Sequence, residues 1–236
     1  EFTSNYWFSW SHRRNAEEGS LLVFSSTVNK VIAAEHVQQC KHVHDPEHDV
    51  EACKLDSSNQ RTFHAASKTM ERWSALKTFQ ELKQQGYTIT VLIHDRDAST
   101  SSHLQAVFPE ATESFDVNHY KKNIVAHVEA LADLYDCLNG FAVKLGAHIK
   151  YAAKNSNEES TFIAVLDSFI PHCCGDLSKC QEDRCKYKYD KNKVQTVLLS
   201  AEHEVKAIAQ LSNIIETIKK DSAKLINAPC SNIVES

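Results

Sequence analysis

A run of apolar and β-branched residues at Thr88–His94 constrains the fold of this chain most. Such a run is typical of a strand buried on both faces, and Gly86 marks the turn before it. The predicted strand ends at Asp95, where a helix is expected to begin near Ser99. Ligands of open α/β sheets bind at the carboxyl ends of strands, so Asp95 is a candidate functional carboxylate. The alternative is that Asp95, Asp97 or Ser99 only caps the helix.

The first half of the chain is predicted to form a mixed α/β unit. Short β runs at Ser20–Ser25 and Lys30–Glu35 suit an antiparallel hairpin that follows a first strand near Ser9–Ala16. The elements expected after them are a helix capped by Ser67, the strand into Asp95, a helix over Ser99–Val107 and a short strand over Ser114–Asp116.

The second half is predicted to be helical. Apolar residues recur at three- and four-residue steps from Ile124 to Ile149, which predicts one long amphipathic helix of about eight turns. A second series from Leu198 to Ile218 predicts another helix. Stripes of this kind usually face a core. With 236 residues and 42% hydrophobic content, the chain is long enough to bury one.

Several short motifs follow in the order seen in cut-and-paste DNA transposases. They are Phe63–Glu71, Gly86–Tyr87, His94–Asp97, Phe108–Glu110, Asp116 with His119, and Ser231–Ser236. From about Ser9 to Ser236 the chain therefore resembles the catalytic core of a eukaryotic DDE transposase of the Mutator-like or Kolobok-like kind. The resemblance implies an RNase H-like mixed sheet flanked by helices, with a large all-α insertion before the catalytic Glu.

The same resemblance implies a division of the chain. Residues 1–120 would be the first part of the RNase H-like core, and 121–228 would be the helical insertion, with a Cys/His-rich loop at 172–185. Residues 229–236 would begin the segment that carries the catalytic Glu. The chain ends one residue after Glu235 and has no initiating Met, so we expect it to be a fragment. The alternative is that Glu1-Phe2 is a cloning remnant.

The resemblance also implies site residues. Asp95 matches the second catalytic Asp, with Asp97 as the weaker candidate, and Glu235 matches the catalytic Glu of an Asn-x-x-Glu-Ser element. Asp116 and His119 match an Asp-x-x-His element and would be accessory. Asp95 and Glu235 would bind Mg²⁺ or Mn²⁺, because such ions prefer hard oxygen ligands.

The first catalytic Asp is the departure from the pattern. Trp7 stands in its place, and an indole cannot bind a hard cation. Unless Glu1 or a residue outside this chain substitutes, we expect an incomplete metal site and an inactive chain. The alternative function is a non-catalytic DNA- or protein-binding module, domesticated from a transposase with the same fold.

Cysteine spacing suggests a second metal. Four thiols and an imidazole fall within fourteen residues, namely His172, Cys173, Cys174, Cys180 and Cys185. Such a set favours structural Zn²⁺, although the spacing matches no standard zinc finger and free or buried thiols are the alternative. Related transposases carry a similar stretch, with a His where Leu177 stands here. A looser group comprises Cys40, His42, His44, His48 and Cys53. Disulfides are less expected, because the chain looks intracellular.

Basic residues suggest where DNA would bind, although the net charge is −5. The candidates are Arg13, Arg14, Lys186, Lys188, Lys191 and Lys193. The last four alternate in part with Tyr, which suits phosphate pairing and base stacking, but an ordinary solvated loop is the alternative. The resemblance implies transposon ends and target DNA as partners, a homodimer as one assembly, and a nuclear location. No apolar run is long enough to predict a membrane span.

Overall fold

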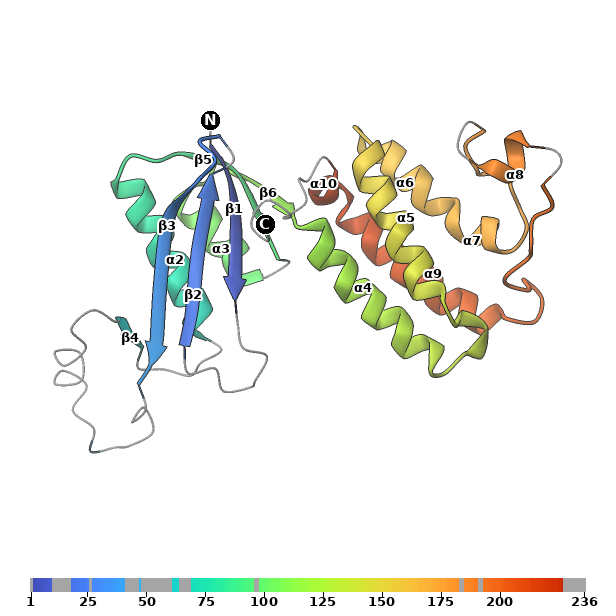
Figure 1. Cartoon of the computed structure of the whole chain (residues 1–236), viewed down its shortest axis with the longest axis horizontal. Helices are drawn as coiled ribbons and strands as arrows, with labels where there is room; N and C mark the ends of the chain where they lie inside the picture. Colours follow the sequence, from blue (N-terminus) through green and yellow to red (C-terminus); the bar gives the residue numbers. More distant parts are fainter. Residues whose placement is uncertain are drawn as a thin grey trace. The chain divides into compact units, whose positions relative to one another are not determined.

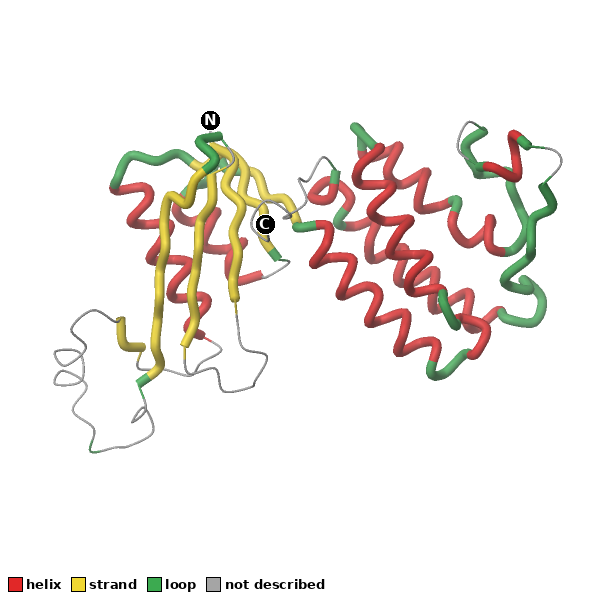
Figure 2. The backbone as a smooth tube through the Cα atoms, viewed as in Figure 1, coloured by secondary structure: helices red, strands yellow, loops and turns green. Residues whose placement is uncertain are grey.

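The structure is a computed structural model that describes residues 2–9, 18–25, 27–40, 47, 61–63, 69–95, 98–182, 185–190 and 193–226. Two compact units divide it, and the boundary falls between Glu113 and Ser114. The first unit contains the long strands together with helices, and the second is mainly helical (Figure 2).

The first unit is built on a six-stranded mixed sheet with the order β4-β3-β2-β1-β5-β6 (Figure 1). The strands are β1 (Phe2–Ser9), β2 (Glu18–Ser25), β3 (Lys30–Gln39), β4 (Arg61–Phe63), β5 (Ile89–His94) and β6 (Thr112–Phe115). β1, β2 and β3 are antiparallel neighbours, whereas β5 runs parallel to β1. Residues 27–29 form a turn between β2 and β3, and Asn29 has a φ of 52°, a conformation that Asn tolerates better than most residues.

Two helices, α2 (Met70–Gln84) and α3 (Ala98–Val107), pack against this sheet. Their Phe79 and Leu104 meet Leu21 of β2 and Leu92 of β5 in one buried cluster. A register shift in the β1–β5 pairing falls between Phe2 and Thr3, which face Ile89 and Val91. Such a bulge reverses the alternation of side chains, which explains why Ile89 and Leu92 both join the cluster although they are three residues apart.

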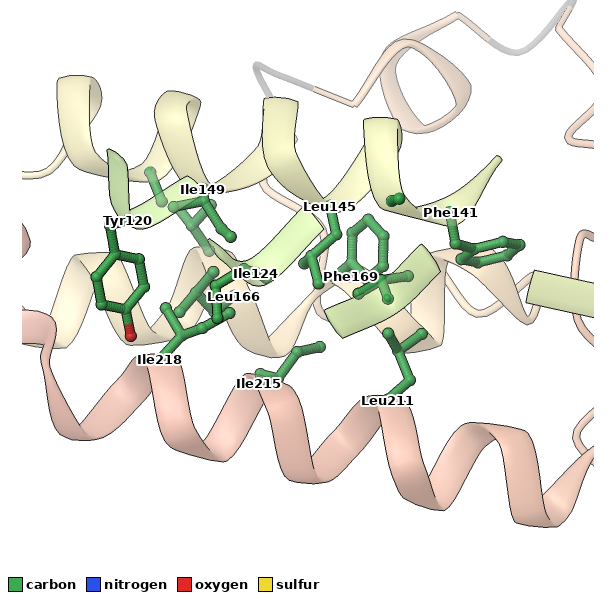
Figure 3. Packing of buried hydrophobic residues seen from close by; sticks show 14 of the residues in the cluster. Tyr120, Ile124, Phe141, Leu145, Ile149, Leu166, Phe169, Leu211, Ile215 and Ile218 are labelled. Atoms are coloured by element: carbon green, nitrogen blue, oxygen red, sulfur yellow. The ribbon is translucent and has the colours of Figure 1, made fainter. Parts of the chain in front are cut away.

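The second unit is a bundle of helices. They are α4 (Val117–Ala132), the 3₁₀ turn η2 (Asp136–Leu138), α5 (Phe141–Asn155), α6 (Glu159–Asp167), α7 (Phe169–Cys173), α8 (Lys186–Tyr189), α9 (Val205–Lys220) and α10 (Ser222–Leu225). Figure 3 shows the core between them, where Leu145, Leu166 and Ile218 are fully buried. None of the helices in the described ranges is both long enough and apolar enough to span a bilayer.

Three predicted elements are corrected by the structure. The single helix over Ile124–Ile149 is wrong: α4 ends at Ala132 and α5 begins at Phe141. Gly140, with a φ of 78°, adopts a left-handed conformation that suits Gly and interrupts the helix. The apolar stripe continued across this break because α4 and α5 pack on each other, with Gly146 against Val125.

The helix predicted from Leu198 begins only at Val205. The Glu204 carboxylate accepts a hydrogen bond from the Ser200 backbone N–H (2.5 Å), which holds the preceding residues in a turn. The first strand is also misplaced in the prediction, since β1 ends at Ser9 instead of beginning there. Its aromatic residues before Ser9 are typical of a strand. The predicted cap Ser67 lies outside the described residues.

Candidate functional sites

Asp95 follows the last residue of β5, three positions before α3 begins, and its side chain is half-buried. The strand register pairs Asn5 with Ile93 on the parallel neighbour β1. If this register is continued for two residues beyond the last pair, Trp7 lies level with Asp95. The residue that this continued register brings level with Asp95 is thus one whose side chain has no oxygen atom.

A buried histidine precedes Asp95. The His94 side chain is 1% exposed, and its Nε2 lies 2.7 Å from a Glu113 carboxylate oxygen, while its Nδ1 lies 2.5 Å from the Asp95 carbonyl oxygen. Ser101 of α3 donates a hydrogen bond to the same Glu113 oxygen. Both ring nitrogens of His94 thus lie at hydrogen-bonding distance from an oxygen atom. The network links the end of β5 to β6 and α3.

Asp116 is the N-cap of α4. Asp116 is only 5% exposed. Its carboxylate accepts hydrogen bonds from the backbone N–H groups of Asn118 (2.7 Å) and His119 (3.1 Å). This geometry satisfies two of the free donors at the start of the helix. His119 lies in the first turn of α4 and is half-buried. Asp97 and Glu235 lie outside the described residues.

Three of the five predicted zinc ligands converge. His172 of α7, Cys180 of the following loop and Cys185, the N-cap of α8, place their ligand atoms within 4.8 Å of one another. We call these residues the HCC cluster. The His172 Nδ1 lies 3.3 Å from the Cys180 sulfur and 3.8 Å from the Cys185 sulfur. Distances of this order leave room for an ion between the three atoms, since Zn–S bonds are about 2.3 Å and Zn–N bonds about 2.0–2.1 Å.

Local backbone features position the HCC cluster. Gly175 has a φ of 89° and ends α7, and its N–H donates to the His172 carbonyl. The loop then turns back, because the Cys180 N–H donates to the Leu177 carbonyl (3.0 Å) and the Asp176 carboxylate accepts from the Ser178 N–H (2.8 Å). Gly at such a position costs no steric strain.

The protonation states of the apo cluster follow from its burial. Burial and the neighbouring Cys185 thiol raise the pKa of Cys180 to about 11, so this thiol is protonated at neutral pH. Burial, together with the positive charge of Lys186, lowers the pKa of His172, so the imidazole is neutral and able to bind a metal. Zinc would therefore have to displace thiol protons.

The other two predicted ligands lie apart from the HCC cluster. Cys173 is 3% exposed and belongs to the helical core, where burial raises its pKa to about 12. Cys174 packs against the same core, and burial also raises its pKa. The structure thus gives these two thiols a packing role. In the looser N-terminal group, Cys40 is buried, while His42, His44, His48 and Cys53 lie outside the described residues.

The predicted DNA-binding lysines have different environments. Lys188 donates a hydrogen bond to the Cys180 carbonyl (2.8 Å), so it stabilises the loop of the HCC cluster. Lys193 pairs with Asp190 at 3.4 Å. Lys186 is exposed, and its ammonium lies 4.8 Å from the centre of the Tyr187 ring. Arg13, Arg14 and Lys191 lie outside the described residues.

Sequence reasoning missed a cavity of about 510 Å³ beside the HCC cluster. Lys144, His148 and Tyr151 of α5 line it, together with the three cluster residues and Lys186 and Tyr187. The spacing i, i+4, i+7 places these three α5 residues on one face, and that polar stripe is the signal that the sequence contained.

A comparison with family models agrees with these features. Residues 6–187, which include Asp95, Asp116, His119 and the HCC cluster, match the model of the Mutator-like transposase. This match defines the chain as derived from a DNA transposase. It belongs to the Mutator-like transposase family, which confirms the resemblance read from its motifs. No curated protein matches the chain.

Proposed function

We propose that this chain is the core of a DDE transposase whose intact relatives cleave and join DNA strands with Mg²⁺ or Mn²⁺. The observation that carries the proposal is Asp95 at the carboxyl end of β5, next to the parallel strand β1. The order β3-β2-β1-β5-β6, with the first three strands antiparallel, supports an RNase H-like sheet. The helical unit would then be the insertion that precedes the Glu-bearing segment.

The donor set decides what this chain can do. Two divalent ions about 4 Å apart would activate the attacking oxygen and stabilise the leaving oxygen in an intact relative. Here Asp95 would supply one oxygen ligand, and Glu235 would supply another from outside the described residues. Trp7, level with Asp95, supplies none. The described residues do not complete a two-ion site, and we therefore expect this chain to be inactive in cleavage.

The alternative is a binding module that has kept the fold without the chemistry. The same Trp7 favours it, since a residue that cannot bind metal occupies the position beside Asp95. For both functions, the catalytic core and the binding module, we propose DNA as the partner and the nucleus as the location. A homodimer stays a prediction.

Restoring the missing carboxylate separates the two functions. Trp7→Asp and the unaltered chain would be incubated with Mn²⁺ and transposon-end DNA, and nicked products would be counted on a denaturing gel. We expect products only from Trp7→Asp, and none from Trp7→Asp combined with Asp95→Ala. Cleavage by the unaltered chain that Asp95→Ala abolishes would show that the first acid lies elsewhere. No cleavage by any version, despite DNA binding, would favour the binding module.

We also propose that the HCC cluster binds a structural zinc ion. A His and two Cys within 4.8 Å form a soft donor set, and Zn²⁺ is usually held by four such ligands. The fourth position would be filled by water, because Leu177 stands where related transposases have a His. A bound ion would fix the loop between α7 and α8.

Zinc stoichiometry and affinity test this proposal. Purified chain should contain one equivalent of zinc by elemental analysis, and Cys180→Ser should lose it. Leu177→His should bind zinc at least tenfold more tightly in a competition with a chromogenic chelator, because it adds a ligand. Cys137→Ser, which alters a thiol outside the HCC cluster, is the control. Equal zinc content in Cys180→Ser and Cys137→Ser would refute the site.

A further inference from the structure

The cavity beside the HCC cluster has the dimensions of a ligand site. Its volume of about 510 Å³ lies within the range of about 300–1,000 Å³ that small-molecule sites occupy. Its walls come from α5, from α6 and α7, and from the segment that carries α8. His172, Cys180 and Cys185 form part of one wall, so an ion in the HCC cluster would also fix the shape of the cavity.

The sign of the charge around the cavity identifies the class of ligand. Lys144 and Lys186 line it, and no carboxylate does so among the described residues. Burial lowers the pKa of His148, so the positive charge at the cavity comes from the two lysines. A ligand with a negative group would be favoured at such a site.

Aromatic side chains supply the second requirement. Tyr151, Phe169 and Tyr187 line the cavity, and the Tyr187 ring lies 5.8 Å from the His172 ring, tilted by 44°. Tyr187 is half-buried, whereas Tyr189, two residues later in the same short helix, is 60% exposed and does not line the cavity. Aromatic faces bind planar rings, and DNA bases stack on them with little dependence on sequence.

We propose that this cavity binds one nucleotide of a single-stranded DNA segment. The base would pack against Tyr187 and Tyr151, and its phosphate would pair with Lys186 and Lys144. This inference rests on the DNA-binding part of the proposed function and deepens it, because it names the ligand and the residues that recognise it. It does not depend on the carboxylates of the sheet. A free nucleotide carries the same chemistry, and the test separates the two sources.

Fluorescence anisotropy with a labelled short oligothymidylate, and with the same strand made of abasic residues, measures base recognition. Tyr187→Ala should weaken binding of the normal strand about tenfold, because one stacked base is worth about 1–3 kcal/mol and about 1.4 kcal/mol is tenfold. It should leave the weaker binding of the abasic strand unchanged. Tyr189→Ala, the matched control, should alter neither.

Charge reversal at Lys186 tests the phosphate contact. Lys186 and the control residue Lys179 are both exposed, so neither substitution should disturb folding. Lys186→Glu should weaken binding of both strands, whereas Lys179→Glu, with the same change of net charge on a nearby turn, should have a much smaller effect. Thymidine monophosphate should compete only at far higher concentration if a strand is the natural ligand. Competition at equal concentration would instead assign the cavity to free nucleotides.

Two outcomes would overturn the inference in distinguishable ways. DNA binding that Tyr187→Ala and Tyr189→Ala reduce equally, or that is the same for both strands, would remove the cavity and leave the proposed function intact. No DNA binding by the chain under any condition would remove both. Cleavage by Trp7→Asp is measured separately, so it reports on the sheet alone.

Discussion

The two units build their candidate sites in opposite ways. In the sheet unit, the proposed site draws on residues far apart in the sequence, with Trp7 on β1, Asp95 after β5 and Glu235 near the end of the chain. In the helical unit, the HCC cluster comes from one short segment between α7 and α8. One substitution would therefore be enough to disable the proposed first site, while the second has three converging ligands.

The apolar cores of both units are built without the carboxylates of the proposed metal site. The sheet core consists of residues such as Leu21, Phe79 and Leu92, none of which belongs to the proposed metal site. The strand beside Asp95 accepts Trp7 in its register without losing its pairing to β2. A transposase core can thus lose its chemistry while its structure persists, because burial of apolar area stabilises the sheet and ligand atoms do not.

Separate cores predict separate unfolding. Leu145→Ala, at a fully buried position of the helical core, should destabilise that unit by about 2–5 kcal/mol through the lost burial and the cavity it leaves. Calorimetry should show its transition shifted to lower temperature and the transition of the sheet unit unchanged. Leu92→Ala should do the reverse.

The control is Val143→Ala, two residues away on the same helix, because Val143 is 73% exposed. Its effect should be within about 0.5 kcal/mol. A single transition that both buried substitutions lower equally would break the comparison, since it would mean that the two units unfold together.

Much of the sheet unit was predictable from sequence, for a physical reason. A strand buried on both faces needs the continuous β-branched run of Thr88–His94, and β5 confirms it. The β-bulge in the β1–β5 pairing was not predictable, because a run of apolar and β-branched residues shows no alternation between polar and apolar positions. The limits of β1 were missed, although its aromatic residues lie before Ser9 and not in the predicted segment Ser9–Ala16.

Prediction was weaker in the helical unit. The break at Gly140 left the apolar stripe intact, so periodicity alone joined α4 to α5, although Asn139-Gly140 is a turn signal. Density of thiols identified the three residues of the HCC cluster but did not exclude Cys173 and Cys174 from it. His172 and Cys173 are adjacent on α7 and therefore point in different directions, which only the packed structure resolves.

A buried histidine in the helical unit predicts a dependence on pH. Burial lowers the pKa of His148 below its ordinary value of 6.5, and its Nε2 lies 2.7 Å from the Val165 carbonyl. The unfolded chain then binds a proton more readily than the folded chain. Stability is fully present above about pH 6.5 and decreases as the pH falls below it, by at most about 1.4 kcal/mol per pH unit.

Denaturant titrations between pH 7.5 and 5.5 measure this effect as the difference between the chain and His148→Gln. The difference in the free energy of unfolding between the two proteins should narrow toward acidic pH, because the variant has no imidazole at position 148 to protonate. His127→Gln, at an exposed position of α4, is the control and should leave the pH profile unchanged. Parallel profiles for the chain and His148→Gln would contradict the assignment.

The smallest effect distinguishes a helix cap from a metal ligand at Asp116. Asp116→Ala should destabilise the helical unit by about 1 kcal/mol, because the backbone N–H groups of Asn118 and His119 lose their acceptor. Asp116→Asn should lower the stability of the unit by only a few tenths of that amount, since Asn caps a helix as well as Asp does. Thermal unfolding of the three proteins measures both values. In the Trp7→Asp background, Asn at 116 should also preserve cleavage if the carboxylate is only a cap. Loss of cleavage in Asp116→Asn with unchanged stability would instead assign Asp116 to the chemistry of cleavage.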